Sequence, residues 1–307
     1  MPDLILHHYD LSPFAHKARL MMGLKGLAWK SVVIPMIMPK PDLMPLTGGY
    51  RKTPILQIGA DLYCDTQLIA AELERRKPSP TFYPHGGVGM AQMLTAWADQ
   101  NMFLSAANYV LGAIADKMPP AFFADRAAMR GAPPPDIEKL KAAAPRMLSA
   151  VQMQLDLLES LLADGRQFVL GDKPGLADLS IHHIVWFMKG SGRRAAAAVE
   201  PYRAINAWAA RVDAIGQGQR SELDSKAALA IAKAATPEAH TDSIDVGEFG
   251  PKLGQKVAVQ PEDKTPEPVI GEVVLIRANE VAIKRHDAQV GDVVVHFPRL
   301  GYIVRPV

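Results

Sequence analysis

The chain has 307 residues, of which 49% are hydrophobic and 21% charged, with a formal net charge of +2 at pH 7. The length predicts two or three globular domains, and this small charge gives no reason to expect a nucleic acid or a membrane surface as partner. A single cysteine, Cys64, excludes an intrachain disulfide. No segment approaches the roughly 20 apolar residues of a membrane span, and the start "MPDLILHHYD" does not have the pattern of a signal peptide. We therefore expect a soluble cytoplasmic protein.

Residues 1–84 alternate strand and helix signals and predict a small mixed sheet with two helices. Gly26 ends the first helix, because glycine suits the left-handed position after a helix. The second helix has an acidic start and a basic end, which match the helix dipole. The predicted elements are a strand at 3–9, a helix at 14–26, a strand at 29–35, a hairpin around Gly59 and a helix at 65–77.

Residues 88–234 lack strand signals and predict an all-helical domain. The segment "GAPPPD" interrupts it with three prolines, and Asp136 suits the start of the next helix as its cap. The predicted helices lie at about 88–115, 120–130, 136–163, 176–190, 201–214 and 221–234.

The composition changes again after Ala235. Residues 235–252 show no periodicity and predict a linker or an arm that wraps around the rest of the chain. Residues 253–307 are rich in valine and isoleucine between turn residues, and they predict a small all-β module of four or five strands. Such a short module has a marginal core, so we expect it to pack on the rest of the chain or on a partner.

Three segments, "SPFAHKARLMMGLKGL", "RKTPILQIGADLYCDTQLIAAELERR" and "VLGDKPGLADLSIHHIVWF", together resemble the soluble glutathione transferase superfamily. The resemblance covers about residues 1–220 and does not extend to the C-terminal module. It implies an α/β thioredoxin-like N-terminal domain, an all-α second domain, glutathione as co-substrate and a homodimer.

The resemblance also implies a glutathione-binding set. Thr53 precedes Pro54, which resembles the family's cis-proline, and the alternative is an ordinary trans proline opening a strand. Asp65 and Thr66 resemble the acidic and hydroxyl pair that meets the γ-glutamyl group, where a helix N-terminus favours negative charge. Lys52 matches a position that meets the glycyl carboxylate, and the loop residue Lys40 is a second candidate.

Ser12 lies where the family places the group that stabilises the thiolate. A hydroxyl that donates a hydrogen bond to the sulfur lowers the pKa of the thiol, and the glutathione thiolate then attacks an electrophile. Tyr9 is the alternative donor, and Ser12 followed by Pro13 is also a favoured start of a helix. A serine cannot form the mixed disulfide that a cysteine forms at this position, and Cys64 fits a small packing residue.

Two further groups of residues complete these expectations. Gly175 stands where the family has a serine or threonine cap, while Asp178 keeps the acidic residue of that folding motif. His182 and His183 are adjacent on a helix and so do not have the spacing of a helical metal pair; we expect no metal site. The electrophile pocket is expected between the two domains, with Phe14, Met36, Met38, Trp97, Phe103 and Tyr109 in its walls.

The favoured function is therefore that of a glutathione transferase acting on a small hydrophobic electrophile by conjugation, ether cleavage, dehalogenation or isomerisation. The alternative is a non-catalytic ligand-binding or scaffold protein of the same fold, with the β module as its interaction surface. Nucleic-acid binding by the module is not expected, because few aromatic residues accompany its basic side chains.

Overall fold

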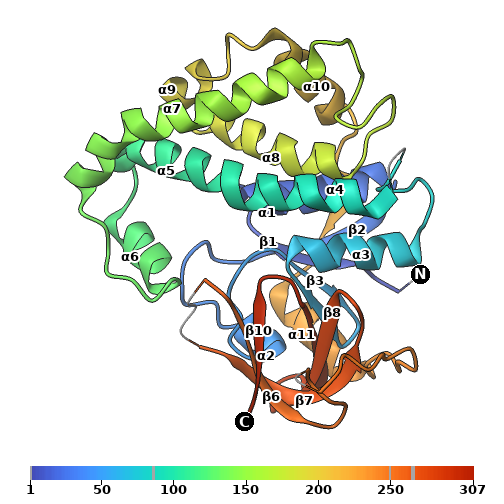
Figure 1. The fold of residues 1–307 in the computed structure, drawn as a ribbon. Coiled ribbons are helices and arrows are strands. Elements are labelled where there is room, and N and C mark those ends of the chain that lie inside the picture. Colours follow the sequence, from blue (N-terminus) through green and yellow to red (C-terminus); the bar gives the residue numbers. More distant parts are fainter. Residues whose placement is uncertain (1, 85–86, 249, 264–266) are drawn as a thin grey trace.

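The structure is a computed structural model that describes residues 2–84, 87–248, 250–263 and 267–307. In Figure 1 the long helices lie on one side of the molecule, the first strands in its middle and the last strands at the opposite end. The N-terminal domain has the predicted thioredoxin-like order. Its elements are β1 (Ile5–His8), α1 (Pro13–Leu24), β2 (Ala28–Val33), α2 (Met44–Thr47), β3 (Ile55–Ile58), β4 (Asp61–Cys64) and α3 (Thr66–Arg76).

The second domain is helical, as predicted, with α8 in its centre. Eleven of the fifteen residues of α8 are buried, which explains its nearly continuous apolar sequence. The elements are α4 (Gly87–Ala96), a π-helical turn η1 (Trp97–Met102), α5 (Phe103–Ala113), a 3₁₀ turn η2 (Ala115–Lys117), α6 (Pro120–Ala128), α7 (Ile137–Leu162), α8 (Leu176–Gly190), α9 (Arg193–Ala197) and α10 (Arg203–Asp213).

The start of α8 explains the glycine in its folding motif. The carboxylate of Asp178 accepts the backbone N–H groups of Gly175 and Val169 at 3.0 and 2.8 Å, and the indole N–H of Trp208 at 2.8 Å. A Cβ at Gly175 would lie only 2.8 Å from Pro84 and 2.9 Å from the carbonyl oxygen of Phe82. The close approach of this loop therefore requires glycine where the family pattern has a hydroxyl residue.

The chain returns to the sheet after α10, which differs from the expectation of helices alone up to residue 234. The strand β5 (Gln219–Glu222) pairs in parallel with β2, and α11 (Ser225–Ala234) buries Ala228, Leu229 and Ala232 against the sheet. All four residues of β5 are exposed. Its sequence therefore has no alternation of apolar and polar residues that could have predicted a strand.

The C-terminal module, for which four or five strands are predicted, has five, and they continue the first sheet instead of forming a separate one. They are β6 (Lys256–Pro261), β7 (Val269–Ile276), β8 (Glu280–Asp287), β9 (Gly291–Pro298) and β10 (Tyr302–Pro306). β9 pairs in parallel with β4, with Asp61 opposite Val294 and Tyr63 opposite His296. The result is one ten-stranded sheet in the order β10-β6-β7-β8-β9-β4-β3-β1-β2-β5.

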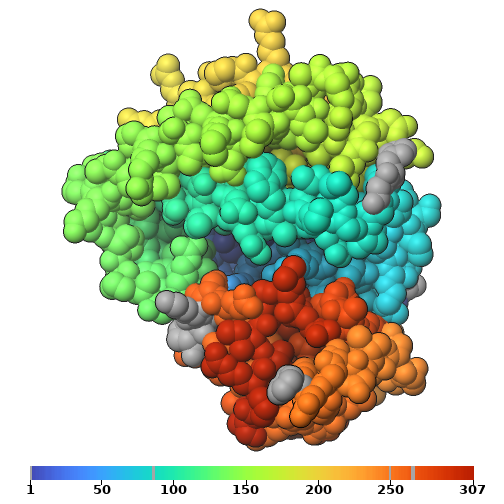
Figure 2. Space-filling model, viewed as in Figure 1, coloured from blue at the N-terminus to red at the C-terminus, as the bar shows by residue number. Residues whose placement is uncertain are grey.

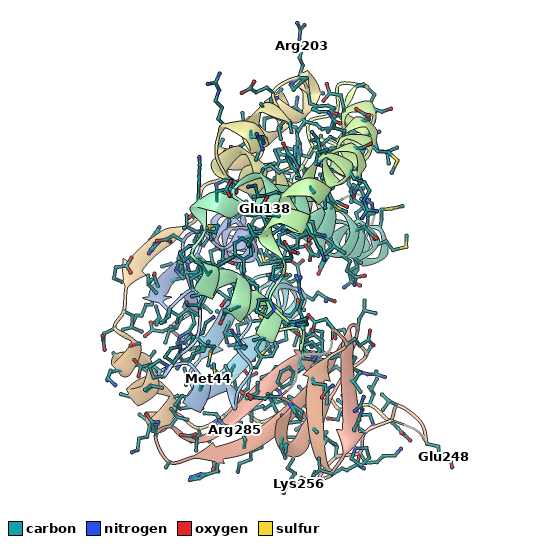
Figure 3. All side chains as sticks on the ribbon, turned by 90° about the vertical axis from the view of Figure 1, so that its left-hand side faces the viewer. Met44, Glu138, Arg203, Glu248, Lys256 and Arg285 are labelled. Atoms are coloured by element: carbon teal, nitrogen blue, oxygen red, sulfur yellow. The ribbon has the colours of Figure 1, made fainter. Side chains whose placement is uncertain are left out.

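The C-terminal half of this sheet curls over the N-terminal domain. Tyr302 of β10 contacts Phe297 of β9, with ring centroids 5.8 Å apart, although three strands separate β10 from β9 in the sheet. Both rings also contact Tyr50, which follows α2. Figure 3 shows Met44 of α2 close to Arg285 of β8, whose guanidinium donates to the carbonyl of Pro45. The core of the module is therefore shared with the N-terminal domain.

The predicted linker, residues 235–252, has no helix or strand where it is described. It is nevertheless held against the sheet. The backbone N–H of Glu238 donates to Asp61 at 2.9 Å, and that of Ile244 donates to the carbonyl of Ile276 at 2.9 Å. The side chain of Asp242 pairs with Arg277 at 2.7 Å. These contacts fix the linker between α3 and the last strands.

Candidate glutathione site

Three loops that carry predicted site residues meet at one end of the first four strands. β1 runs antiparallel to β3, and β3 runs antiparallel to β4, with His7 opposite Ile55 and Ile55 opposite Cys64. The end of β1, the start of β3 and the end of β4 therefore lie side by side. This brings together the segments that contain Ser12, Thr53-Pro54 and Asp65-Thr66.

Ser12 is the N-cap of α1. Its Oγ accepts the backbone N–H of Ala15 at 3.2 Å, and Pro13 occupies the first helical position. The residue is only 3% exposed. No acceptor for the Ser12 hydroxyl proton is found among the described residues. Capping uses a lone pair of the oxygen and leaves that proton available, so the two roles considered for Ser12 are compatible.

Tyr9, the alternative donor, lies beside helix α6. Its hydroxyl accepts a hydrogen bond from the guanidinium of Arg126 at 3.1 Å, and the same group donates to the carbonyl of Met36 at 3.1 Å. The neighbouring Asp125 accepts the backbone N–H of Met38 at 2.9 Å and pairs with Arg51. Helix α6 thus fixes the position of the loop after β2 through Asp125 and Arg126, and it binds the hydroxyl oxygen of Tyr9 through Arg126.

The peptide bond between Thr53 and Pro54 is cis. Next to it, the amine of Lys40 is buried and donates to the carbonyl of Arg51 at 3.0 Å and to the hydroxyl of Thr53 at 3.3 Å. Burial, together with the charges of Arg126 and Arg51, lowers the pKa of Lys40 to about 8. Lys40 therefore stabilises the loop before β3. Its amine is buried and does not lie in solvent, where it would be free to bind a carboxylate of a ligand.

Asp65 has φ 73° and ψ 143°, and among the described residues other than glycine it alone has a positive φ. A non-glycine residue in this region is uncommon and often marks a functional position. One carboxylate oxygen of Asp65 caps α3 through the backbone N–H of Gln67 at 3.0 Å. Thr66 is buried as the first residue of α3. The pair thus stands at a helix N-terminus, as the resemblance implied.

The second carboxylate oxygen of Asp65 has a partner from the C-terminal module. The hydroxyl of Tyr302 donates to it at 3.3 Å. The hydroxyls of Tyr302 and Tyr50 also share a hydrogen bond of 2.7 Å. Burial raises the pKa of both tyrosines well above the ordinary value, so both remain protonated donors. The module therefore reaches the γ-glutamyl subsite that the sequence predicted.

The module also reaches the predicted glycyl subsite. The amine of Lys52 pairs with the carboxylate of Asp263 at 2.6 Å, and both side chains are partly exposed. A carboxylate of the protein is thus bound by the lysine expected to meet a carboxylate of glutathione. In both subsites the end of the chain supplies a polar contact to a predicted ligand-binding side chain.

The six residues expected in the electrophile pocket do not all lie together. Phe14 and Phe103 contact each other across the two domains, with ring centroids 4.6 Å apart. Met36 and Met38 lie on the loop held by α6, and Trp97 packs against the core of the helical domain. Tyr109 is buried, and its hydroxyl donates to the carbonyl of Arg194 at 3.0 Å. Tyr109 thus belongs to the helical core.

Figure 2 shows a hollow between the helical domain and the C-terminal strands. Residues of the N-terminal domain, in blue, form its floor, and α5 and α6 border it on the side of the helical domain.

Cys64, His182 and His183 are buried, and the ring of His183 contacts those of Phe14 and Phe103, with centroids 4.9 and 5.9 Å apart. Cys64 is fully buried, and burial raises the pKa of its thiol well above the ordinary value, so it is a packing residue. His182 and His183 are buried, and Nε2 of His182 contacts Asp213 at 3.1 Å. Two His/Asp groups with close ligand atoms occur among the described residues, one of which includes His182.

Sequence reasoning missed four residues around the site: Asp125, Arg126, Asp263 and Tyr302. Each comes from an element far along the chain, and each reaches the site through the packing of that element. The apolar pattern of "GYIVRPV" predicted a strand, but no local signal shows that this strand curls back to Asp65. Only the three-dimensional pairing of β4 with β9 provides that information.

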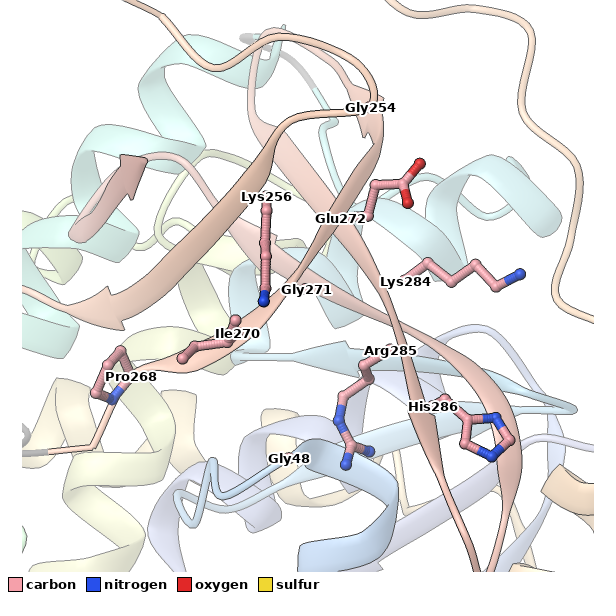
Figure 4. Close-up of a pocket in the computed structure, with 10 residues that line it drawn as sticks. All are labelled: Gly48, Gly254, Lys256, Pro268, Ile270, Gly271, Glu272, Lys284, Arg285 and His286. Carbon is pink, nitrogen blue, oxygen red and sulfur yellow. The ribbon is translucent and has the colours of Figure 1, made fainter. Parts of the chain in front are cut away.

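A separate pocket of about 530 Å³ lies on the outer face of the C-terminal strands (Figure 4). Its cationic side chains do not converge: in Figure 4 the amines of Lys256 and Lys284 point in different directions. Lys284 pairs with Asp292 at 2.8 Å, and Arg285 pairs with Asp287 at 3.3 Å. Much of the positive charge here is therefore neutralised within the strands themselves.

The comparisons with known proteins agree with this fold. The N-terminal domain family of glutathione S-transferases matches residues 6–81, and a domain of unknown function (DUF7962) matches residues 111–220. A GST-like protein from Pseudomonas syringae, solved by crystallography, is 42% identical over 100% of both chains, with a TM-score of 0.80. The chain belongs to this family of glutathione S-transferase-like proteins.

More distant solved structures share the fold of the first two domains. The Tau class glutathione S-transferase MiGSTU from mango, Mangifera indica, is 17% identical over 69% of this chain and 89% of its own, with a TM-score of 0.53. The beta-etherase LigF from Sphingobium sp. strain SYK-6 is 17% identical over 69% and 95%, with a TM-score of 0.51. No curated protein matches the chain. None of the helices that the structure describes is long and apolar enough to span a membrane.

Proposed function

We propose that this protein binds glutathione across the ends of β1, β3 and β4 and uses it as a nucleophile against a small hydrophobic electrophile. The observation that carries the proposal is the capped but uncommitted hydroxyl of Ser12, at the start of α1. In this mechanism the hydroxyl donates to the glutathione sulfur and stabilises the thiolate. The backbone of Thr53 pairs with the cysteinyl part of the ligand, as in strand addition.

The ends of glutathione are assigned to the flanking residues. Asp65 and Thr66 bind the γ-glutamyl group at the N-terminus of α3, where the helix dipole favours its carboxylate. Lys52 binds the glycyl carboxylate. Lys40 stabilises the loop that carries Lys52 by donating hydrogen bonds to Arg51 and Thr53. The electrophile enters through the hollow seen in Figure 2, and Phe14, Phe103, Met36 and Met38 are assigned as its apolar contacts.

The test combines binding and turnover in the full chain. The Ser12→Ala variant is expected to lose about 10- to 100-fold in kcat/KM with aryl halides, isothiocyanates or aryl ethers, because a hydrogen bond to a charged group contributes about 1.5–3 kcal/mol. The loss should shrink at high pH, where the thiol ionises without help. Glutathione binding should persist, and Ser160→Ala, at an exposed serine of α7, serves as the matched control.

A second function is supported by a specific observation. Asp263 and Tyr302 already contact Lys52 and Asp65, so the module could keep the site closed in a protein that binds partners and does not turn over substrate. Absence of glutathione binding at millimolar concentration in the unmodified protein would overturn the transferase proposal and favour this one. Binding that is weakened by Lys52→Ala and Thr66→Ala would favour the first.

We further propose that the protein forms a homodimer in the cytoplasm. Large apolar side chains are exposed on α4, α5 and α7, among them Met93, Leu104, Met153 and Leu157. Exposed large apolar side chains on neighbouring helices are candidates for a protein interface. Light scattering coupled to size exclusion measures the assembly, and a monomer at micromolar concentration would contradict this proposal.

A further inference from the structure

A second polar cluster lies away from the candidate glutathione site, where the linker crosses the junction of the two halves of the sheet. It consists of Asp61 at the start of β4, His240 in the linker and His296 in β9. One ligand atom from each residue lies within 4.8 Å of the other two. Three segments distant in the sequence thus bring one carboxylate and two imidazoles to one point.

The ring of His296 is held in the orientation that a metal ligand requires. Its Nδ1 donates to Glu280 at 2.6 Å, and Glu280 is in turn paired with Arg277 at 2.8 Å. Tyr63 stacks on the ring at 4.2 Å. Histidines that bind zinc usually donate their other ring N–H to a carboxylate, which fixes the tautomer. Nε2 of His296 therefore faces Asp61, at 3.1 Å from its carboxylate oxygen.

His240 completes the cluster with an unused nitrogen. Its Nε2 is buried and has no hydrogen-bond partner in the described structure. The ring stands edge-on to His296, with centroids 5.6 Å apart. A buried polar nitrogen without a partner costs free energy, and a cation bound by this cluster would supply the missing partner.

The distances suit a tetrahedral ion. Zinc bonds of about 2.0–2.2 Å place neighbouring ligand atoms roughly 3.3 Å apart. Asp61 and His296 already have this spacing, and the ligand atom of His240 lies within 4.8 Å of both, so an ion draws it closer by at most about 1.5 Å. The carboxylate of Asp61 is also positioned from behind, since its other oxygen accepts the backbone N–H of Glu238.

The second His/Asp group found among the described residues differs in how its rings are held, although His16 Nε2 and His182 Nδ1 are also buried without a hydrogen-bond partner there. His16 and His182 approach Asp213 behind α1, but Asp213 is 53% exposed in its side chain. His16 stacks on Trp186 at 4.1 Å, and its Nδ1 meets the amide of Gln217 at 3.4 Å. No carboxylate orients either ring from behind among the contacts of the described residues. This group is therefore the natural internal comparison.

We propose that Asp61, His240 and His296 bind one divalent cation of the zinc type, with Glu280 orienting His296 and a water molecule as fourth ligand. The ion ties the linker and β9 to β4. Its role is to fasten the C-terminal half of the sheet to the N-terminal domain. The proposal is independent of glutathione turnover.

The test uses the full chain, stripped with a chelator and titrated with Co²⁺ and then Zn²⁺. We expect one equivalent of Co²⁺ with the visible absorption of a tetrahedral N/O site, displaced by Zn²⁺, and a rise in Tm on zinc binding. His240→Gln should abolish both signals. Glu280→Gln should weaken binding about 10- to 100-fold, as changes behind a zinc ligand do.

Two controls separate this site from others. His286→Gln alters an exposed histidine of the same module, paired with Asp292, and should leave the titration unchanged. His182→Gln alters the comparison group and should also leave it unchanged. A folded protein that binds no cobalt at stoichiometric concentration, or that binds it equally well as His240→Gln, would overturn the proposal and leave His296 as a hydrogen-bonded link between Asp61 and Glu280.

Discussion

Lys40 and Ser12 show how burial changes the chemistry of a polar side chain at this site. Both are 3% exposed. The hydroxyl of Ser12 accepts one bond and keeps its proton for a ligand, whereas the amine of Lys40 donates to its own loop. A lysine in a loop predicts a mobile charge on the surface. In the structure the amine of Lys40 is instead buried, stabilises its own loop and has a lowered pKa.

The depressed pKa of Lys40 predicts a pH dependence of stability. The pKa is about 8 in the folded protein and the ordinary 10.5 in the unfolded chain. Between these values the unfolded chain retains the proton that the folded protein releases, so the free energy of unfolding contributed by Lys40 rises with pH from about 8 to 10.5. The change is at most roughly 3 kcal/mol.

The measurement compares the unmodified protein with Lys40→Met in denaturant titrations at several pH values. The difference in free energy of unfolding should grow in favour of the unmodified protein between pH 8 and 10.5. Lys139→Met, at an exposed lysine of α7, should show no such trend. A difference that stays flat across this range would contradict the buried, deprotonated amine.

At the scale of single elements, the start of α8 tests whether the steric cost of a side chain at position 175 exceeds the stabilisation that a serine cap provides. Gly175→Ser restores the usual cap residue but places a Cβ 2.8 Å from Pro84 and 2.9 Å from the carbonyl of Phe82. We expect a loss of about 1–3 kcal/mol in the free energy of unfolding, the range typical of overpacking.

The matched control for Gly175 is Gly190→Ser at the other end of the same helix. A Cβ at Gly190 meets nothing within 4 Å, so only a small change is expected. Thermal denaturation of both variants gives the comparison. Equal stability of Gly175→Ser and the unmodified protein would mean that the loop of Phe82 and Pro84 moves to accommodate the added side chain at little cost in free energy.

The elements predicted from sequence are those whose signals are local. Asp136 caps α7 through the backbone N–H groups of Glu138 and Lys139, and Ser12 with Pro13 begins α1, as their residue types indicated. β5 escaped prediction because its four residues are all exposed and owe their strand conformation to pairing with β2. Predicting it required knowledge of where the chain returns after α10.

On the scale of the whole molecule, the candidate site is formed by residues of the N-terminal domain and of the C-terminal module. The sequence predicts these two regions as separate domains. Thr53-Pro54 and Asp65-Thr66 were found from motifs, because a family resemblance assigns roles to positions. Asp263 and Tyr302 were not, because their approach depends on the parallel pairing of β4 with β9 and on the curl of the last strands. The core strands were predicted, and their joining into one sheet was not.

Because the C-terminal strands continue the sheet of the N-terminal domain, we expect side chains of the C-terminal half to change the affinity for glutathione. Asp263→Asn removes the carboxylate that pairs with Lys52, so the lysine becomes free for the glycyl carboxylate. We expect a roughly two- to fivefold fall in KM for glutathione, the range of an exposed ion pair, with little change in kcat.

The neighbouring acid provides the control for this effect. Glu262→Gln removes the same charge one residue earlier and should leave KM unchanged. Raising the salt concentration should shrink the difference between Asp263→Asn and the unmodified protein, because the pair is partly exposed. A KM that rises in Asp263→Asn would mean that Asp263 assists binding and does not compete with it.

The pairing of β9 with β4 has a further consequence, for aggregation. Without the last five strands, β4 would present a row of unpaired backbone groups, and such exposed strands readily template association between chains. The outermost strands are protected in other ways: β5 carries Arg220 and Glu222, and β10 ends in Arg305 and Pro306. We therefore expect that a chain shortened before β6 precipitates where the full chain stays dispersed.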